Sequence, residues 1–321
     1  MQMIYDMFEN KEVKIVQGKK MLFIYNPHAG KAGIRSNLLD IIDVFTKAGY
    51  LVTAYPTQQV GDAIDATIEL SGGYDLVACS GGDGTLDEVV TGMMKCEKRI
   101  PIGYVPAGST NDFAKSLRIS SNMKKAADSI VQGRAFPCDI GSFNDDTFVY
   151  IAAFGLFTDV SYATDQQMKN VLGHMAYILE GAKRLGNVKS YDMEIHYEDE
   201  DGLDIKIQDE FLFGMVTNSV SVGGFKRITG KHVKLDDGVF EVILIQKPKD
   251  LIELNNIMVN LVAKNFDDQH MYCFKTKHIT FRSKEAVAWT LDGEYGGSHV
   301  DVEIENEQKA LTIIVPQGKD D

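Results

Sequence analysis

The chain has 321 residues, of which 44% are hydrophobic and 25% charged, a composition typical of a globular protein with one large domain or two smaller ones. Its formal net charge of −13 argues against nucleic acid as the main partner, because nucleic-acid-binding surfaces need clustered positive charge. No stretch approaches the roughly 20 apolar residues of a membrane span. The four cysteines lack metal-binding or redox spacing, which predicts free thiols in a reducing cytoplasm.

Residues 1–20 do not share the pattern that follows them. Acidic side chains separate two short apolar runs, and the long apolar core of a secretory signal is missing. This stretch predicts either an edge strand or hairpin, or an extension that precedes the fold. We favour the extension and expect the first domain to begin at Met21.

Strand-like and helical segments alternate between residues 21 and 138. The expected strands are Met21–Tyr25, Leu51–Tyr55, Leu76–Ala78 and Ile100–Val105. Single helices between successive strands predict right-handed crossovers and a doubly wound, mostly parallel sheet in an α/β domain. Ligands of such sheets bind beyond the carboxyl ends of the strands.

Three glycine-containing loops follow these expected strands, namely Asn26–Gly33, Gly81–Thr85 and Gly108–Asp112. The second loop reads G-G-D-G-T and leads into a helical pattern, so its backbone N–H groups and the helix dipole favour a phosphate. A carboxylate at Asp83 makes sense there mainly beside a cation. The alternative is a tight turn without a ligand, but the expected convergence of three loops at one edge favours the site.

Residues 139–321 are expected to form a largely antiparallel β-sandwich that holds the substrate. Asp-Gly and Gly-Gly turns divide this part into short strand-like segments. Two helical segments, 170–185 and 251–262, interrupt it, and the first carries an apolar stripe that we expect to face the core. The short junction near Cys138 predicts a cleft between the two domains. Whether the C-terminal tail returns to the first domain is left open.

Four motifs, in this order, resemble those of the soluble bacterial diacylglycerol kinases and related lipid kinases. They read N-P-H-A-G at Asn26–Gly30, G-G-D-G-T at Gly81–Thr85, P-A-G-S-T-N-D-F-A at Pro106–Ala114 and L-D-G-E-Y-G-G at Leu291–Gly297. G-G-D-G-T also occurs in NAD kinases and phosphofructokinases, so the third and fourth motifs are the more specific. The resemblance covers the chain from Met21 onward and implies an ATP-binding α/β domain, a β-sandwich and an active site between them.

The resemblance also implies which residues bind ATP and Mg²⁺. The implied nucleotide contacts are Asn26, Pro27, His28, Ala29, Gly30, Thr57, Gly81, Gly82, Asp83, Gly84, Thr85, Glu88 and Ser109. Three acidic residues, Asp83, Asp112 and Asp139, correspond to positions that hold magnesium and water at the phosphates. A separate structural magnesium would be bound by the Asp237 carboxylate and by the main-chain carbonyls of Lys234 and Val239.

The fourth motif supplies the catalytic carboxylates Asp292 and Glu294, which the resemblance implies act together with Asp83. Phosphoryl transfer needs charge neutralisation and a carboxylate that accepts the hydroxyl proton. Without the resemblance, D-G-E would be interpreted as a simple hairpin turn rather than as a catalytic motif. Which carboxylate accepts the proton is left open. Two positions depart from the family pattern. Asp87 replaces the usual asparagine, which predicts added negative charge near the nucleotide, and Ser109 replaces threonine but keeps the hydroxyl.

The sequence therefore predicts an ATP-dependent lipid kinase that phosphorylates diacylglycerol to phosphatidic acid in phospholipid metabolism. Two alternatives stay open: a soluble-metabolite kinase of the NAD kinase type, and a nucleotide-binding regulator without catalysis. We expect a cytoplasmic protein that associates peripherally with the membrane surface carrying its lipid substrate, and a homodimer is left open. Lys226, Arg227, Lys231 and Lys234 form a basic cluster suited to an anionic lipid surface.

Overall fold

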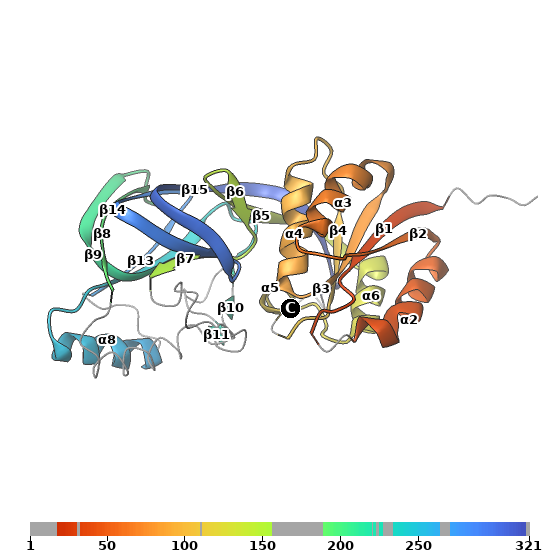
Figure 1. Cartoon of the computed structure of the whole chain (residues 1–321), viewed down its shortest axis with the longest axis horizontal. Coiled ribbons are helices and arrows are strands. Elements are labelled where there is room, and N and C mark those ends of the chain that lie inside the picture. The colour runs from red at the N-terminus through yellow and green to blue at the C-terminus, as the bar shows by residue number, and fades with distance from the viewer. Residues whose placement is uncertain are drawn as a thin grey trace, which may run out of the picture.

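The computed structural model describes residues 18–30, 33–109, 111–155, 189–219, 221–222, 225–226, 234–263 and 270–318. The expected helix at 170–185 lies outside these residues, as do Arg227 and Lys231 of the basic cluster and residues 1–17 of the expected extension. Two regions lie next to each other along the long axis of the molecule, one α/β and one mainly β (Figure 1).

The α/β region is built on four parallel strands in the order β4-β3-β1-β2. These strands are β1 (Lys19–Tyr25), β2 (Tyr50–Pro56), β3 (Leu76–Gly81) and β4 (Ile102–Pro106). Every residue of β3 and β4 is buried, as expected for central strands of a parallel sheet that is covered on both faces.

Helices cover these strands in two pairs. The helices are α2 (Ile34–Lys47), α3 (Asp62–Leu70), α4 (Asp83–Met94), the short α5 (Asp112–Ser116) and α6 (Met123–Gln132). The helix α2 packs against α6, and α3 packs against α4. The two pairs lie on either side of the strands in Figure 1. This arrangement places the N-terminus of α4 at the carboxyl end of β3, where the G-G-D-G-T motif lies.

The β region consists mainly of antiparallel strands. They are β5 (Arg134–Phe143), β6 (Asp146–Phe148), β7 (Ile151–Gly155), β8 (Tyr191–Glu198), β9 (Asp204–Thr217), β12 (Phe240–Gln246), β13 (Met271–Thr276) and β14 (His278–Leu291), with the two-residue pair β10 (Ser221–Val222) and β11 (Phe225–Lys226). The helix α8 (Leu251–Ala263) follows β12. Trp289 lies at the centre of the core of this region. Its ring centroid is 4.8–5.1 Å from the ring centroids of Phe143, Phe154 and Phe281.

One long strand, β15 (Glu294–Val315), joins the two regions. It begins as the antiparallel partner of β14, continues along β5, and ends with Ile313 and Ile314 parallel to β4. The C-terminal segment thus returns to the α/β sheet, and β5 also spans the boundary that we expected at residues 138 and 139. As a result, hydrogen bonds connect thirteen strands of the described residues into one sheet.

The start of β1 differs from the expected start of the fold. Lys19 and Lys20 already pair with Tyr50 and Leu51, and Lys20 N also donates to Asp75 Oδ2 at 2.7 Å. These two residues belong to the sheet because β2 and Asp75 offer them partners that lie far along the chain. Among the helices that the structure describes, none has the length and apolar character needed to cross a membrane.

Candidate active site

The loops after β1, β3 and β4 touch one another at the carboxyl ends of these strands. Asn26 N donates to Ser80 O at 2.9 Å, which fastens the first loop to β3. Gly30 has φ +54°, and a Cβ there would lie 2.3 Å from Ala107 O. Gly82 and Gly108 are also in backbone contact. Glycine is needed at Gly30 and Gly108 because a Cβ at either position would lie less than 3 Å from the backbone of the neighbouring loop.

Gly81 O is the acceptor that holds the second and third loops together. It accepts hydrogen bonds from Ala107 N at 2.7 Å, Gly108 N at 3.1 Å and Tyr104 Oη at 3.1 Å. Asn111 completes this junction: its Oδ1 accepts from Gly108 N at 3.0 Å and its Nδ2 donates to Gly108 O at 2.9 Å. Sequence reasoning did not select Asn111. The sequence feature that could have identified it is an asparagine within a glycine-rich loop, because asparagine tolerates the left-handed φ of 51° found here.

Asp83 is the first residue of α4 and faces the start of α5. Its Oδ2 accepts a hydrogen bond from Asp112 N at 3.3 Å, whereas its Oδ1 is buried and has no hydrogen-bond partner among the residues that the structure describes. Burial and the nearby negative charge of Asp112 raise the pKa of Asp83 to about 6. Asp112 is itself buried and pairs with Lys115 Nζ at 3.0 Å. A buried carboxylate oxygen without a donor fits a cation at this place.

Asp139 lies with a different group of residues. Its carboxylate accepts hydrogen bonds from Gly238 N and Lys309 N, both at 2.7 Å, and its own N donates to Leu235 O at 2.8 Å. It therefore fastens the 234–239 loop to β5 and β15. The structure brings Asp83 and Asp112 together, but the contacts of Asp139 are with the loop that was expected to hold a structural magnesium.

That loop carries a second carboxylate suited to a cation. Asp237 Oδ1 is buried without a hydrogen-bond partner in the described ranges of the chain, and Asp237 Oδ2 lies 3.8 Å from Lys275 Nζ. Lys234 and Val239 stand at the two ends of the loop. Within the described part of the chain, no three His, Cys, Asp or Glu side chains cluster as in an all-protein metal site. Magnesium differs from such metals because it keeps several water ligands and often uses only one or two carboxylates.

Two expected nucleotide contacts have other partners. Both carboxylate oxygens of Glu88 accept hydrogen bonds at the N-terminus of α3, from Gly61 N at 3.0 Å and Ala63 N at 3.2 Å. Thr57 is buried, and its N donates to Tyr25 O at 2.9 Å. Both residues thus support the rim of the loops, while His28 and Ser109 are exposed on it.

The fourth motif forms the β14–β15 hairpin turn. Asp292 and Gly293 have φ values of 51° and 93°, and Leu291 pairs with Glu294, which is the geometry favoured by an Asp-Gly two-residue turn. The Asp292 carboxylate is buried and accepts hydrogen bonds from Val149 N at 2.5 Å and from Tyr150 N and Ile151 N at 2.9 Å. Its oxygens are therefore occupied by the backbone of the β6–β7 segment.

Glu294 has the opposite placement. Its side chain is exposed, and its Oε1 lies 3.8 Å from the position that a Cβ on Gly84 would occupy. Gly84 is the second residue of α4 and directly follows Asp83. Of the two carboxylates in the turn, only Glu294 is placed at the phosphate-type loops.

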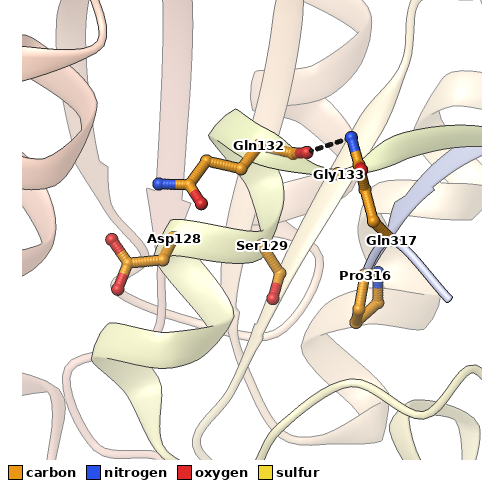
Figure 2. Close-up of a pocket in the computed structure, with 6 residues that line it drawn as sticks. All are labelled: Asp128, Ser129, Gln132, Gly133, Pro316 and Gln317. Carbon is orange, nitrogen blue, oxygen red and sulfur yellow. Dashed lines mark hydrogen bonds between the residues drawn. The ribbon is translucent and has the colours of Figure 1, made fainter. Parts of the chain in front are cut away.

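A surface pocket of about 410 Å³ lies elsewhere, at the C-terminal end of α6 and the end of β15 (Figure 2). Its lining residues are Asp128, Ser129, Gln132, Gly133, Pro316 and Gln317. Gln317 Nε2 donates to Gln132 O at 2.9 Å across it. None of the residues expected at the active site lines this pocket.

The three glycine loops touch one another, Asp83 Oδ1 is buried without a partner among the described residues, and Glu294 lies beside Gly84. This arrangement is typical of a phosphoryl-transfer enzyme. Comparison with known proteins gives the family. Residues 20–143 match the model of the diacylglycerol kinase catalytic domain. The diacylglycerol kinase of Bacillus subtilis is 32% identical, with 94% of this chain and 98% of that protein covered. That of Staphylococcus saprophyticus is 34% identical, with 92% and 99% covered.

The fold comparison agrees. A crystal structure from Bacillus anthracis str. Sterne, described as a candidate diacylglycerol kinase, matches with a TM-score of 0.77 and 28% identity, covering 93% of this chain and 98% of that one. The chain belongs to the diacylglycerol kinase family and is an ATP-dependent lipid kinase.

Proposed function

We propose that this protein transfers the γ-phosphoryl group of ATP to the free hydroxyl of diacylglycerol, forming phosphatidic acid for phospholipid metabolism. The observation that carries this proposal is the position of Glu294, whose Oε1 stands beside Gly84 at the start of α4. The names of the relatives support diacylglycerol as the substrate.

The nucleotide is proposed to lie on the loops at the carboxyl ends of β1, β3 and β4. Their glycines expose backbone N–H groups, and the N-terminus of α4 adds the positive end of its dipole, so both favour phosphate oxygens. The implied contacts at Asn26–Gly30, Gly81–Thr85 and Ser109 all belong to these loops. For Glu88 and Thr57 we propose support of the rim, because their contacts are with α3 and Tyr25.

Magnesium is proposed to bind with ATP at Asp83, with Asp112 beside it. The partnerless Oδ1 of Asp83 fits such an ion. Magnesium bound there would neutralise part of the phosphate charge that develops during transfer. Burial and the charge of Asp112 raise the pKa of Asp83, and a cation bound nearby would lower it again. For Asp139 we propose a structural role in fastening the 234–239 loop.

Glu294 is proposed as the base that accepts the proton of the lipid hydroxyl. A base needs an oxygen that substrate can reach, and Glu294 is exposed at the loops whereas the carboxylate of Asp292 is occupied by three N–H groups. We propose that Asp292 anchors the turn and does not meet substrate. A structural magnesium at Asp237, with the carbonyls of Lys234 and Val239, is supported by the buried, partnerless Asp237 Oδ1.

We also propose the finer architecture and location that the sequence predicted. The parallel strand order and the two helix pairs support a doubly wound nucleotide-binding domain, and the antiparallel strands support a β-sandwich substrate domain. The four free cysteines support a cytoplasmic location. The side chains of Ile252 and Val259, 72% and 57% exposed on α8, support contact with a membrane surface. A homodimer remains an open expectation.

The direct test is labelled ATP and magnesium with a panel of acceptors in mixed micelles: diacylglycerol, monoacylglycerol, a sphingoid base, an undecaprenol-like alcohol and, in solution, NAD. We expect the highest kcat/KM with diacylglycerol. Glu294→Gln should lower kcat roughly 100-fold or more with unchanged ATP affinity. Glu303→Gln, an exposed glutamate further along β15 that contacts His278, is the matched control. Faster labelling of NAD, or wild-type kcat in Glu294→Gln, would overturn the proposal.

A further inference from the structure

One face of α4 makes three successive contacts, through residues spaced four apart. Asp83 lies at the loops that we propose bind phosphate, and Thr91 Oγ1 lies 3.0 Å from Thr147 Oγ1 of β6. Between them, the Asp87 carboxyl group forms a side-chain hydrogen bond with Asp292 of the β14–β15 turn. Residues at i, i+4 and i+8 lie on one side of a helix, so Asp87 lies on the face of α4 that contacts the turn.

A hydrogen bond between two carboxyl groups requires that one of them carries a proton. Burial raises the pKa of Asp292 to about 6, whereas the three N–H groups of Val149, Tyr150 and Ile151 act in the opposite direction and favour its ionised form. Among the described residues no backbone N–H group is found donating to Asp87, and its Oδ1 is buried without a partner. The proton of the pair therefore resides on Asp87.

The charges around Asp87 agree with this assignment. Burial, followed by the effects of Asp292, Asp146 of β6 and Glu88 of its own helix, raises the pKa of Asp87 well above its usual value. Tyr150, which packs on the same turn, is uncharged, because burial raises the pKa of its phenol as well. An aspartate at this position thus shares a proton with Asp292, so that it does not add the full negative charge expected from the sequence.

The position of Asp292 determines where Glu294 stands. Asp292 and Gly293 form the two-residue turn, and Glu294, the next residue, pairs directly with Leu291. We propose that Asp87, in its neutral acid form, is a positioning residue that donates to Asp292 and thereby holds the turn against α4 with Glu294 beside Gly84. This inference rests on the proposed role of Glu294 as the base.

A consequence concerns alkaline pH. Loss of the Asp87 proton leaves two carboxylates facing each other without a hydrogen bond, and their repulsion pushes the turn away from α4. Glu294 then leaves its position at the loops, while the nucleotide-binding loops themselves stay in place. The rate of transfer falls and the affinity for ATP does not.

The test compares Asp87→Ala, Asp87→Asn and the control Thr91→Val in the full chain with diacylglycerol micelles. Alanine removes the donor, so kcat should fall about 10- to 100-fold with KM for ATP within about threefold, the size of effect that a misplaced group produces. Asparagine keeps a donor but cannot ionise, so it should recover most of the lost kcat and abolish the alkaline fall. Thr91→Val removes a neighbouring contact of α4 and should keep the wild-type pH profile.

A double-mutant cycle separates this inference from the function on which it rests. If Asp87 acts through Glu294, then Asp87→Ala should cost less than about threefold in a Glu294→Gln background. Wild-type kcat in Glu294→Gln alone would reject the proposed base. An equal cost of Asp87→Ala in both backgrounds, or the wild-type alkaline fall in Asp87→Asn, would reject the positioning role. If the alanine variant does not fold, the pH profile of Asp87→Asn against wild type still decides.

Discussion

The backbones of Gly82 and Gly108 are in contact, and a Cβ on Gly108 would lie 2.6 Å from Gly82 Cα. The two residues come from loops after neighbouring parallel strands, β3 and β4. This contact closes the surface that we propose binds the phosphates of ATP. Because the atom nearest to a Cβ on Gly108 belongs to the backbone, a side-chain rotation could not relieve the clash, and the loops themselves would have to move apart.

Gly108→Ala should therefore separate the two loops. We expect a loss of at least about tenfold in ATP affinity and of roughly 1–3 kcal/mol in the free energy of unfolding, as for other insertions into tightly packed places. Isothermal titration and denaturant unfolding measure the two effects. Gly72→Ala is the control, since a Cβ at Gly72 meets nothing within 4 Å. Unchanged ATP binding in Gly108→Ala would place the nucleotide elsewhere.

Asp83→Ala should abolish turnover and leave the protein folded, because Asp83 is proposed to hold the metal at the phosphates. Rate and melting temperature should be measured on one sample. A variant that keeps more than about a tenth of wild-type activity, a change in barrier of under ~1.4 kcal/mol, would contradict the metal-binding role.

The raised pKa of Asp83 predicts that, without metal, the free energy of unfolding depends on pH. Its folded pKa, about 6, is above the ordinary value of 3.8, so the folded state binds the proton more tightly. Its contribution to stability is complete below the unfolded pKa and is lost as pH rises toward 6. Asp83→Asn should therefore gain stability relative to wild type between pH 4 and 6, on the order of 1–3 kcal/mol, and show no further gain above. A constant difference across this range would show that Asp83 has an ordinary pKa.

Asp292→Asn should mainly lower stability. An amide offers one acceptor oxygen where the carboxylate accepts three N–H groups, so buried donors lose partners. We expect a loss of roughly 2–4 kcal/mol by denaturant unfolding. Glu294→Gln, two residues away and exposed, should unfold at the wild-type midpoint. An Asp292→Asn protein of normal stability with a large loss of kcat would instead make Asp292 the catalytic residue.

Magnesium should stabilise the protein through Asp237 independently of nucleotide. Adding magnesium to chelator-treated wild type should increase the free energy of unfolding by about 1–3 kcal/mol at saturating concentration, because the ion binds only the folded loop. Asp237→Asn should lose this gain, whereas its neighbour variant Asp236→Asn should keep it. Equal stabilisation of both variants by magnesium would show that the ion binds at another site.

Two N-terminal deletions should behave differently. Removing residues 1–17 leaves β1 complete and should not change ATP affinity, kcat or stability. Removing residues 1–20 deletes the pairings of Lys19 and Lys20 with β2 and the hydrogen bond to Asp75, at a cost of roughly 1–3 kcal/mol. Inactivity of the shorter deletion would show that residues 1–17 contribute to the fold.

The sequence by itself determined the elements whose signals are local. Apolar runs such as Leu76–Ala78 predicted central strands, and the helical pattern at 251–262 predicted α8. Glycine spacing marked the loops Gly81–Thr85 and Gly108–Asp112, because close backbone approach excludes other residues. The four motifs were enough for the family, since their residue types follow from the chemistry that a phosphoryl-transfer site needs.

The tertiary structure alone decided which carboxylates meet. Asp292 and Glu294 look equivalent in the sequence, but the partners of Asp292 lie more than 140 residues away, and only folding brings them together. Asp139 was grouped with Asp83 and Asp112, yet its carboxylate accepts from Gly238 and Lys309. The protonation of Asp87 likewise could not be predicted from the sequence, because it depends on burial and on neighbouring groups from other strands. Sequence periodicity reports on neighbours within a few residues, whereas the environment of a charged group is set by contacts between segments distant along the chain.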